Sequence, residues 1–413
     1  MSRSRRHRWD KDKCPKLPAH SQAKHEILSK YIKKYLHIVC KNRRIEKFNL
    51  TLVDGFSGGG KYENGEPGSP FVMLESVDSA CVEINSHRDK KVNIDPYYFF
   101  VEKDHDNYAQ LAKHLTASKY ADKINNAIIT RNGDFNFHVK EIVDCIKKRN
   151  PKGGGGVIFF LDQDGYSAVS VEVLNYIKRN LPQSEVIINI SISWLIDFIN
   201  NQDNFKKKII DMGLENHVNI NEIFELSKDI SDNRYIIESK LSDSLRQAVG
   251  YEYFRPFFIE PVDNHRGYWL LHLSPHFRAH NAMSEVTWSM GNNMRHYGGI
   301  GTRIFDLSYK PSDEASLELP GMSFNDAAKQ EHIGGLMDDL PKLIWSQEQI
   351  IVNKLVEMTC NNTASTREMY LSSLSELRQN NEIEVRGKNM GIKRGSSIDI
   401  NDVVIPKKQI MLI

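Results

Sequence analysis

The stretch "TLVDGFSGGGKY", residues 51–62, joins an apolar strand, an acid and a run of glycines. Gly58 to Gly60 remove every Cβ from one place, so either a ligand approaches the backbone closely or the chain turns very tightly. A nucleoside-triphosphate loop needs a serine or threonine after its G-K pair, and none follows Lys61. A dinucleotide-binding turn needs a third glycine where Glu63 stands. The glycine run therefore matches neither of these two phosphate-binding motifs well.

Acids stand at or close to the ends of four successive apolar runs, as Asp54, Glu102, Asp134 and Asp162. The runs alternate with helix-like segments, which indicates a parallel sheet. In open α/β sheets, ligands bind outside the carboxyl ends of the strands. The four carboxyl groups are therefore expected around one crevice.

The glycine run matches the pattern D-x-F-x-G-x-G, which resembles the first motif of S-adenosylmethionine-dependent amino-methyltransferases. The methionine end of that cofactor carries an amine and a carboxylate, which an acid and bare backbone amides complement. An acid on the next strand would accept the ribose hydroxyls, and the third acid would accept the adenine amine. The residues expected to bind S-adenosylmethionine are Asp54, Phe56, Ser57, Gly58, Gly60, Glu102 and Asp134. The alternative is that the glycines only turn the chain and the acids are helix caps.

The chemistry is expected just after the fourth strand, in "FFLDQDGY". Amino-methyltransferases carry a D-P-P-Y type sequence there, whose acid and backbone carbonyl accept hydrogens from the target amine while the aromatic ring stacks on the base. Asp162 and Tyr166 are predicted for these roles, and Gln163 for an amide contact to the same amine. Gln163 and Asp164 replace the prolines, and the aromatic comes one position late. Two alternatives therefore stay open: a site that no longer turns over, and a Tyr166 ring that only closes the sheet edge.

Apolar periodicity predicts the scaffold that would hold these residues. Residues 19–40 place apolar side chains at helical spacing, and five apolar runs then predict parallel strands. The polar helical pattern at about 195–250 predicts an inserted helical subdomain. Two apolar runs around a polar turn at 263–267 predict a hairpin, followed by a helix over 275–289. The expected fold class is α/β, with a Rossmann-like class I methyltransferase sheet.

The C-terminal residues 341–413 predict a separate winged-helix module: a helix capped by Ser346, a second helix that runs into a strand, and a closing strand after a polar loop. Residues 1–18 are expected as a basic flexible arm, 19–300 as the methyltransferase-like domain and 301–340 as a linker. The cations of the module that could meet phosphates are Arg367, Arg378, Arg386, Lys388, Lys393 and Arg394. A packing or dimerisation module is the alternative.

Composition limits the remaining possibilities. The 413 residues exceed what one hydrophobic core normally serves, and 55 Lys plus Arg nearly balance 53 Asp plus Glu. The five cysteines form no C-x-x-C pair, so neither a zinc site nor a disulfide framework is indicated. No apolar run is long enough to cross a bilayer, and we expect a soluble cytoplasmic protein without metal or membrane.

The motifs taken together resemble the three-Cys-motif partner (TcmP) family. The resemblance rests on "LPAHSQAKHEILSKYIKKYL", "VDGFSGGGKY", "FFLDQDGY" and "YWLLHLSPHFRAHNAMSEVTW". It implies a class I methyltransferase fold with a C-terminal winged helix and S-adenosylmethionine as cofactor. It also implies a partner that resembles radical-SAM iron–sulfur enzymes, in mobile or defence-related regions of bacterial genomes.

Two functions follow from this resemblance. The first is methyl transfer to a base amine of nucleic acid, with RNA favoured over DNA because the start of the chain also resembles ribosomal-RNA adenine methyltransferases. The second is a non-catalytic subunit that keeps the fold and binds nucleic acid or the three-cysteine partner. The oligomeric state is left open by the sequence.

Overall fold

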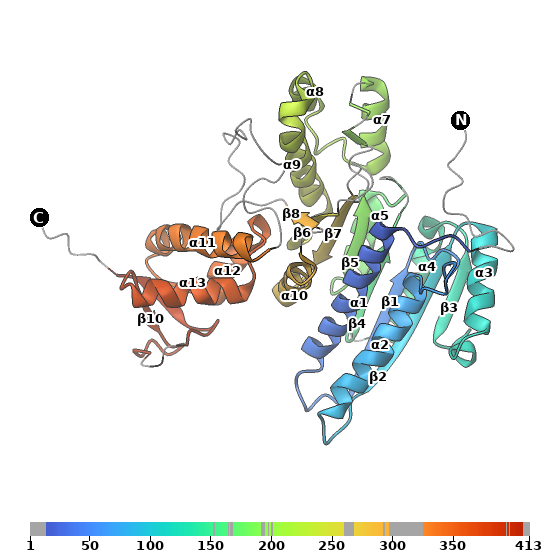
Figure 1. Ribbon diagram of the computed structural model, residues 1–413, viewed down its shortest axis with the longest axis horizontal. Helices are drawn as coiled ribbons and strands as arrows, with labels where there is room; N and C mark the ends of the chain where they lie inside the picture. Colours follow the sequence, from blue (N-terminus) through green and yellow to red (C-terminus); the bar gives the residue numbers. More distant parts are fainter. Residues whose placement is uncertain are drawn as a thin grey trace, which may run out of the picture. The chain divides into compact units, whose positions relative to one another are not determined.

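The computed structural model describes residues 14–151, 153–163, 165, 168–190, 195–196, 198–199, 201–259, 268–291, 294–296, 325–393, 395 and 397–407. The chain divides into two compact units, residues 1–282 and 283–413 (Figure 1). Most of the expected basic arm, Tyr166 and the first part of the expected linker lie outside the described residues.

A largely parallel sheet forms the centre of the first unit. Strand β1 pairs in parallel with β2 and β4. Strand β3 pairs in parallel with β2, and β5 pairs in parallel with β4. The bounds are β1 Lys47–Asp54, β2 Asn93–Glu102, β3 Ile128–Asn132, β4 Gly156–Leu161 and β5 Glu185–Ile190. All six residues of β4 and of β5 are buried, as expected for strands covered on both faces.

An antiparallel hairpin completes this sheet beside β5. Strands β6 (Tyr253–Ile259) and β7 (Tyr268–Ser274) pair with each other, and β7 also pairs antiparallel with β5. Seven strands therefore follow the order β3-β2-β1-β4-β5-β7-β6, with β7 alone reversed among them. The α/β class, the five parallel strands and the hairpin expected from the sequence are confirmed.

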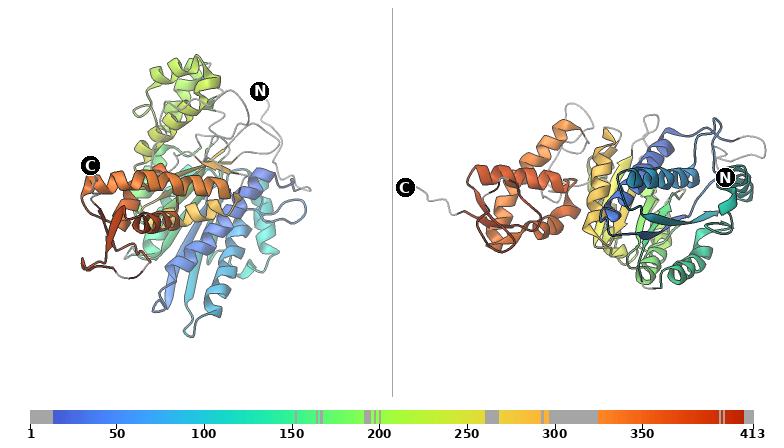
Figure 2. Two further views of the ribbon diagram at one scale, coloured as in Figure 1. Left: turned by 60° about the vertical axis from the view of Figure 1, so that its left-hand side comes forward. Right: turned by 90° about the horizontal axis from the view of Figure 1, so that it is seen from below.

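Helices cover both faces of the sheet. Helices α1 and α2 lie together on one face, and α4 and α5 lie on the other, as the right panel of Figure 2 shows. This arrangement follows from right-handed crossovers between parallel strands. The bounds are α1 Ala19–Val39, α2 Ser69–Ser86, α3 His105–Thr116, α4 Phe135–Arg149 and α5 Val171–Asn180.

Three helices occupy most of the segment expected as a helical insertion between β5 and β6. They are α7 (Gln202–Met212), α8 (Ile220–Ser227) and α9 (Ile230–Val249). Asn201 and Asn219 cap the first two, each accepting a hydrogen bond from a backbone N–H three residues on. Helix α10 (Phe277–Trp288) follows the hairpin, as the sequence predicts, and leads into the second unit.

The described residues of the second unit include helices and a small antiparallel sheet. Helix α11 packs against α13, and the strands follow the order β10-β11-β9. The bounds are α11 Asp326–Gln347, β9 Ile350–Ile351, α12 Val352–Thr359, α13 Arg367–Gln379, β10 Ile383–Arg386 and β11 Val403–Pro406, and a further short strand, β8, spans Met294–His296. Helix, helix, strand, wing and strand agree with the expected winged-helix module.

Helix α11 corrects the domain boundaries predicted from the sequence. It occupies the predicted linker from Asp326 onward, and Ser346 lies in its last turn instead of capping the next helix. The pair of glycines at 334–335 and Pro341 favour a linker when read locally. However, His332, Leu336 and Leu340 recur at helical spacing and are all buried. Tertiary packing therefore outweighs the local breakers.

Gly156, at the start of β4, provides a test of this packing. A Cβ built there would overlap the Tyr35 hydroxyl of α1. We expect Gly156→Ala to lower the free energy of unfolding by about 1–3 kcal/mol, the usual effect of overpacking a core. Gly154→Ala is the matched control, because nothing lies within 4 Å of the Cβ it would add. Urea titration of both variants measures the difference, and equal stability would contradict the packing described.

Candidate functional site

The glycine turn begins where β1 ends. Gly55 donates its N–H to Phe160 O at 3.0 Å, and Ser57 donates to Val101 O at 2.9 Å, so strands on both sides hold the turn. Gly58 and Gly60 have φ angles of +58° and +86°, which favour glycine. A Cβ on Gly60 would come within 3.1 Å of a Leu111 methyl group. The glycines are therefore required by backbone conformation and by close packing.

Glu102, the last residue of β2, is bound to this turn. Its Oε2 accepts the Gly58 N–H at 2.7 Å, and its Oε1 accepts the Asp104 N–H at 2.7 Å. Burial raises the pKa of Glu102, and these two hydrogen bonds oppose the rise. Hydrogen bonds thus join the turn after β1 to the acid at the end of β2.

Asp54 lies beneath the turn and is fully buried. Its Oδ1 accepts the Phe56 N–H at 3.0 Å. Burial raises the pKa of Asp54 to about 7, opposed by hydrogen bonds from Ser69 and Phe56 and increased by the nearby charges of Asp162 and Glu102. Three of the four strand-end acids are therefore close enough to influence one another.

The pH dependence of stability should report on Asp54. Its folded pKa of about 7 lies above the ordinary value of 3.8, so the folded state holds the additional proton between these pH values. This stabilisation is complete below pH 3.8 and is lost as the pH rises through 7, by up to about 1.4 kcal/mol per pH unit. We expect Asp54→Asn to remove this loss. Chemical denaturation of both proteins from pH 4 to 8 measures it, and parallel pH profiles would contradict the burial of a protonated acid.

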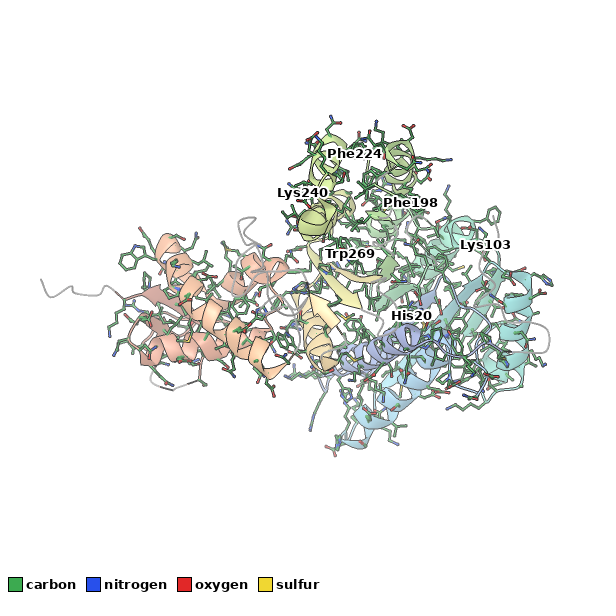
Figure 3. The ribbon with its side chains drawn as sticks, turned by 45° about the horizontal axis from the view of Figure 1, so that its top comes forward. His20, Lys103, Phe198, Phe224, Lys240 and Trp269 are labelled. Carbon is green, nitrogen blue, oxygen red and sulfur yellow. The ribbon has the colours of Figure 1, made fainter. Side chains whose placement is uncertain are left out.

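Asp134 has the role of a helix cap. Its Oδ1 accepts the Asn136 N–H at 3.0 Å at the start of α4, and its Oδ2 pairs with Lys103 at 2.8 Å (Lys103 is labelled in Figure 3). Burial alone would raise the pKa of Asp134, but these two contacts hold it below its ordinary value. The alternative reading of the acids as caps therefore applies to Asp134, and its predicted contact with adenine stays a prediction.

Asp162 and Gln163, the predicted catalytic pair, are both engaged by other groups. Lys24 Nζ lies 2.5 Å from Asp162 Oδ1, and the two side chains are 5% and 18% exposed. The buried Gln163 side chain accepts the Val169 N–H through Oε1 at 2.9 Å. Its backbone carbonyl accepts Asn189 Nδ2 at 3.4 Å. Tyr166, the predicted stacking ring, lies outside the described residues.

Two further residues lie near Asp162 and are not among the predicted site residues. His25 lies on α1 beside Lys24, and burial lowers its pKa to about 4, with Asp162 raising it and Lys24 lowering it. The Tyr62 ring lies 6.1 Å from that of His25, and burial, followed by the charge of Asp162, raises its pKa. Lys24 and His25 belong to the buried face of α1, where polar residues among apolar ones are a signal that the sequence carries. Tyr62 is the last residue of the motif "VDGFSGGGKY".

Several of the predicted phosphate-binding cations of the winged helix contact other groups of the protein. Arg378 donates Nη1 to Gly395 O at 2.7 Å and Nη2 to Lys393 O. Arg386 pairs with Glu384 at 2.9 Å, and the Lys393 ammonium pairs with Asp402. Arg394 lies outside the described residues.

The solvent side of α13 is acidic. Its exposed residues are Glu368, Ser372, Glu376 and Gln379. The second helix of a helix-turn-helix normally enters the major groove, where glutamates would repel phosphates. Residues 325–407 hold 10 Lys plus Arg against 12 Asp plus Glu. The charge of this module therefore gives no support to phosphate binding through α13.

Comparison with known proteins identifies this module. Residues 308–389 match the GMT-like wHTH domain. The match begins inside the predicted linker and includes all of α11, α12 and α13, so it supports the corrected boundary and the winged-helix assignment. No curated protein matches the chain.

Among solved structures, the chain is similar to protein LPL1258 from Legionella pneumophila, described by the family model DUF519. The two are 10% identical, with 61% of this chain and 86% of that one covered, at a TM-score of 0.32. A likeness at this TM-score adds nothing to the argument.

Among the described residues, no helix could span a membrane. Nor do those residues include a group of three or more His, Cys, Asp or Glu side chains that could hold a metal ion.

Proposed function

We propose that the chain is an S-adenosylmethionine-dependent methyltransferase acting on a base amine of nucleic acid, with RNA favoured over DNA. The observation that carries the proposal is the joined arrangement of the glycine turn and Glu102 at the carboxyl edge of the sheet. The resemblance to the TcmP family, which includes the glycine turn, also supports it. So does the strand order, whose parallel strands and reversed β7 are those expected of a class I methyltransferase.

The residues at this edge fit the cofactor chemically. The backbone amides of the glycine turn suit the cofactor's methionine carboxylate, although the Gly58 N–H is already donated to Glu102. Glu102 accepts hydrogen bonds from the backbone of Gly58 and Asp104 and from the side chain of Asn107, and its carboxylate is the proposed acceptor for the ribose hydroxyls. Once bound, S-adenosylmethionine supplies an electrophilic methyl group to the target amine.

The role proposed for Asp162 is to orient the target amine and to receive its proton, directly or through water. Because the ammonium of Lys24 is bound to Asp162, an arriving base must share that carboxylate with Lys24 or move the lysine away. Gln163 is held by hydrogen bonds from the Val169 backbone and the Asn189 side chain. Its proposed role is therefore to position the neighbouring Asp162, not to contact the amine itself. Tyr166 is the proposed stacking ring.

A second candidate function is a binding subunit without transfer activity. The engagement of Asp162 by Lys24 and of Gln163 by Val169 favours it, because both predicted acceptors are satisfied without substrate. The acidic winged helix would then contact protein, and the iron–sulfur partner implied by the TcmP resemblance is one candidate.

The deciding experiment is calorimetric titration of the full chain with S-adenosylmethionine and S-adenosylhomocysteine. Binding of both ligands is expected, and it would justify incubation with labelled cofactor and pools of RNA and DNA. Labelled methyl groups in RNA support the first function. Cofactor binding without transfer to either pool supports the binding subunit, and absence of cofactor binding overturns the proposal.

A further inference from the structure

Two loops at the amino ends of β1 and β2 form a hydrogen-bonded platform in the first unit, at the lower end of Figure 1. Residues 41–46 precede β1, and residues 87–92 precede β2. Arg88 ties the loops together by donating Nη2 to Asn42 O at 2.9 Å, and Asn93 donates its N–H to Glu46 O at 2.8 Å. Within the first loop, the Asn42 side chain accepts the Arg44 N–H at 3.0 Å.

This platform is strongly basic. Residues 41–47 and 87–95 hold seven Lys plus Arg against three Asp plus Glu. Two of the acids are neutralised locally, since Lys47 pairs with Asp95 at 3.2 Å and the Lys90 ammonium pairs with Glu46. Four exposed cations are left without a side-chain partner among the described residues: Lys41, Arg43, Arg44 and Lys91. We call these four residues the amino-edge patch.

We propose that the amino-edge patch binds the phosphodiester backbone of the nucleic-acid substrate, at the opposite end of the sheet from the candidate active site. The inference rests on the proposed function, whose substrate is nucleic acid. It identifies a second place where that substrate contacts the protein. Unpaired, exposed cations on an ordered platform release counterions when they meet phosphates, which is the main source of affinity for nucleic acid. In the winged helix, by contrast, acids outnumber cations and several of the cations are already paired.

The position of the patch sets the kind of ligand. Strand β1 has eight residues, so the patch lies about 26 Å from the glycine turn at about 3.3 Å per residue. A small phosphate compound cannot reach both places, whereas a nucleic-acid strand can. An anionic membrane is the other extended polyanion, but the exposed large apolar residues of the described chain include none in these two loops. Nucleic acid is therefore the ligand that fits.

The test measures binding of a fluorescein-labelled RNA of about 30 nucleotides by anisotropy over a range of salt concentrations. The variant is Lys41→Gln, Arg43→Gln and Arg44→Gln together. The matched control replaces three exposed lysines elsewhere in the same unit by glutamine, namely Lys113, Lys148 and Lys207. We expect the patch variant to bind RNA at least about tenfold more weakly and the slope of log affinity against log salt to fall by about 2, with the control close to the parent protein.

Unchanged affinity in the patch variant, or an equal loss in the control, would overturn the inference. So would tighter binding to vesicles containing phosphatidylserine than to RNA. Both variants are also titrated with S-adenosylmethionine. Because the patch is remote from the glycine turn, this titration separates failure of the patch proposal from failure of the proposed function. Cofactor binding with normal RNA binding by the variant rejects the patch alone. A loss of RNA binding in a protein that never bound the cofactor rejects the methyltransferase alone.

Discussion

Asp162→Asn is expected to lower the rate of methyl transfer by about 100-fold or more. The affinity for S-adenosylmethionine should stay within about twofold of that of the parent protein. The amide keeps the shape of the carboxylate but loses the negative charge that would orient the target amine and receive its proton. The proposed cofactor contacts lie mainly with the glycine turn and Glu102, and among the described residues Asp162 acts on this region electrostatically, through Asp54 and Tyr62. Single-turnover transfer of labelled methyl groups and calorimetry on the same protein measure the two quantities.

The ion pair with Lys24 requires its own control. Removing one partner of a buried pair leaves the other charge uncompensated, so the single variant also lowers the free energy of unfolding. Lys24→Met together with Asp162→Asn removes both charges and should recover stability without recovering transfer. Asp144→Asn, on the exposed side of α4, controls for a changed surface charge. Transfer at the parental rate by a folded Asp162→Asn protein would refute the assignment and leave the binding subunit as the better function.

Continuous apolar runs made the first unit predictable. Strand β4 consists of glycine and apolar residues and four of the six residues of β5 are apolar, as is typical of a sheet covered on both faces. The acids at or after the ends of β1 to β4 come to one edge because parallel strands share a direction. The position of Asp54 and Glu102 beside the glycine turn therefore follows from the strand pattern of the sequence.

The contacts of Asp162 were beyond the reach of sequence patterns. Lys24 comes from α1, 138 positions away, and a buried lysine pairs with an acid only through tertiary packing. Likewise, nothing in "DQDGY" indicates that the Gln163 amide serves the Val169 backbone. In the second unit, glycines and a proline concealed α11, because helix propensity is a weak preference that packing overrides.

Glu102→Ala is expected to weaken S-adenosylmethionine binding by about 100-fold, for two reasons that a second variant separates. Alanine removes the proposed acceptor of the ribose hydroxyls, and it also leaves the N–H groups of Gly58 and Asp104 without their acceptor. Glu102→Gln keeps an oxygen for one of these N–H groups and removes the charge, so it should retain more of the turn and weaken binding by about tenfold. Glu66→Gln, outside this arrangement, is the control. If all three proteins bound the cofactor like the parent, the turn and Glu102 would be structural features only. A graded loss, largest for alanine, would instead identify the carboxylate as the group that joins the turn to the ligand.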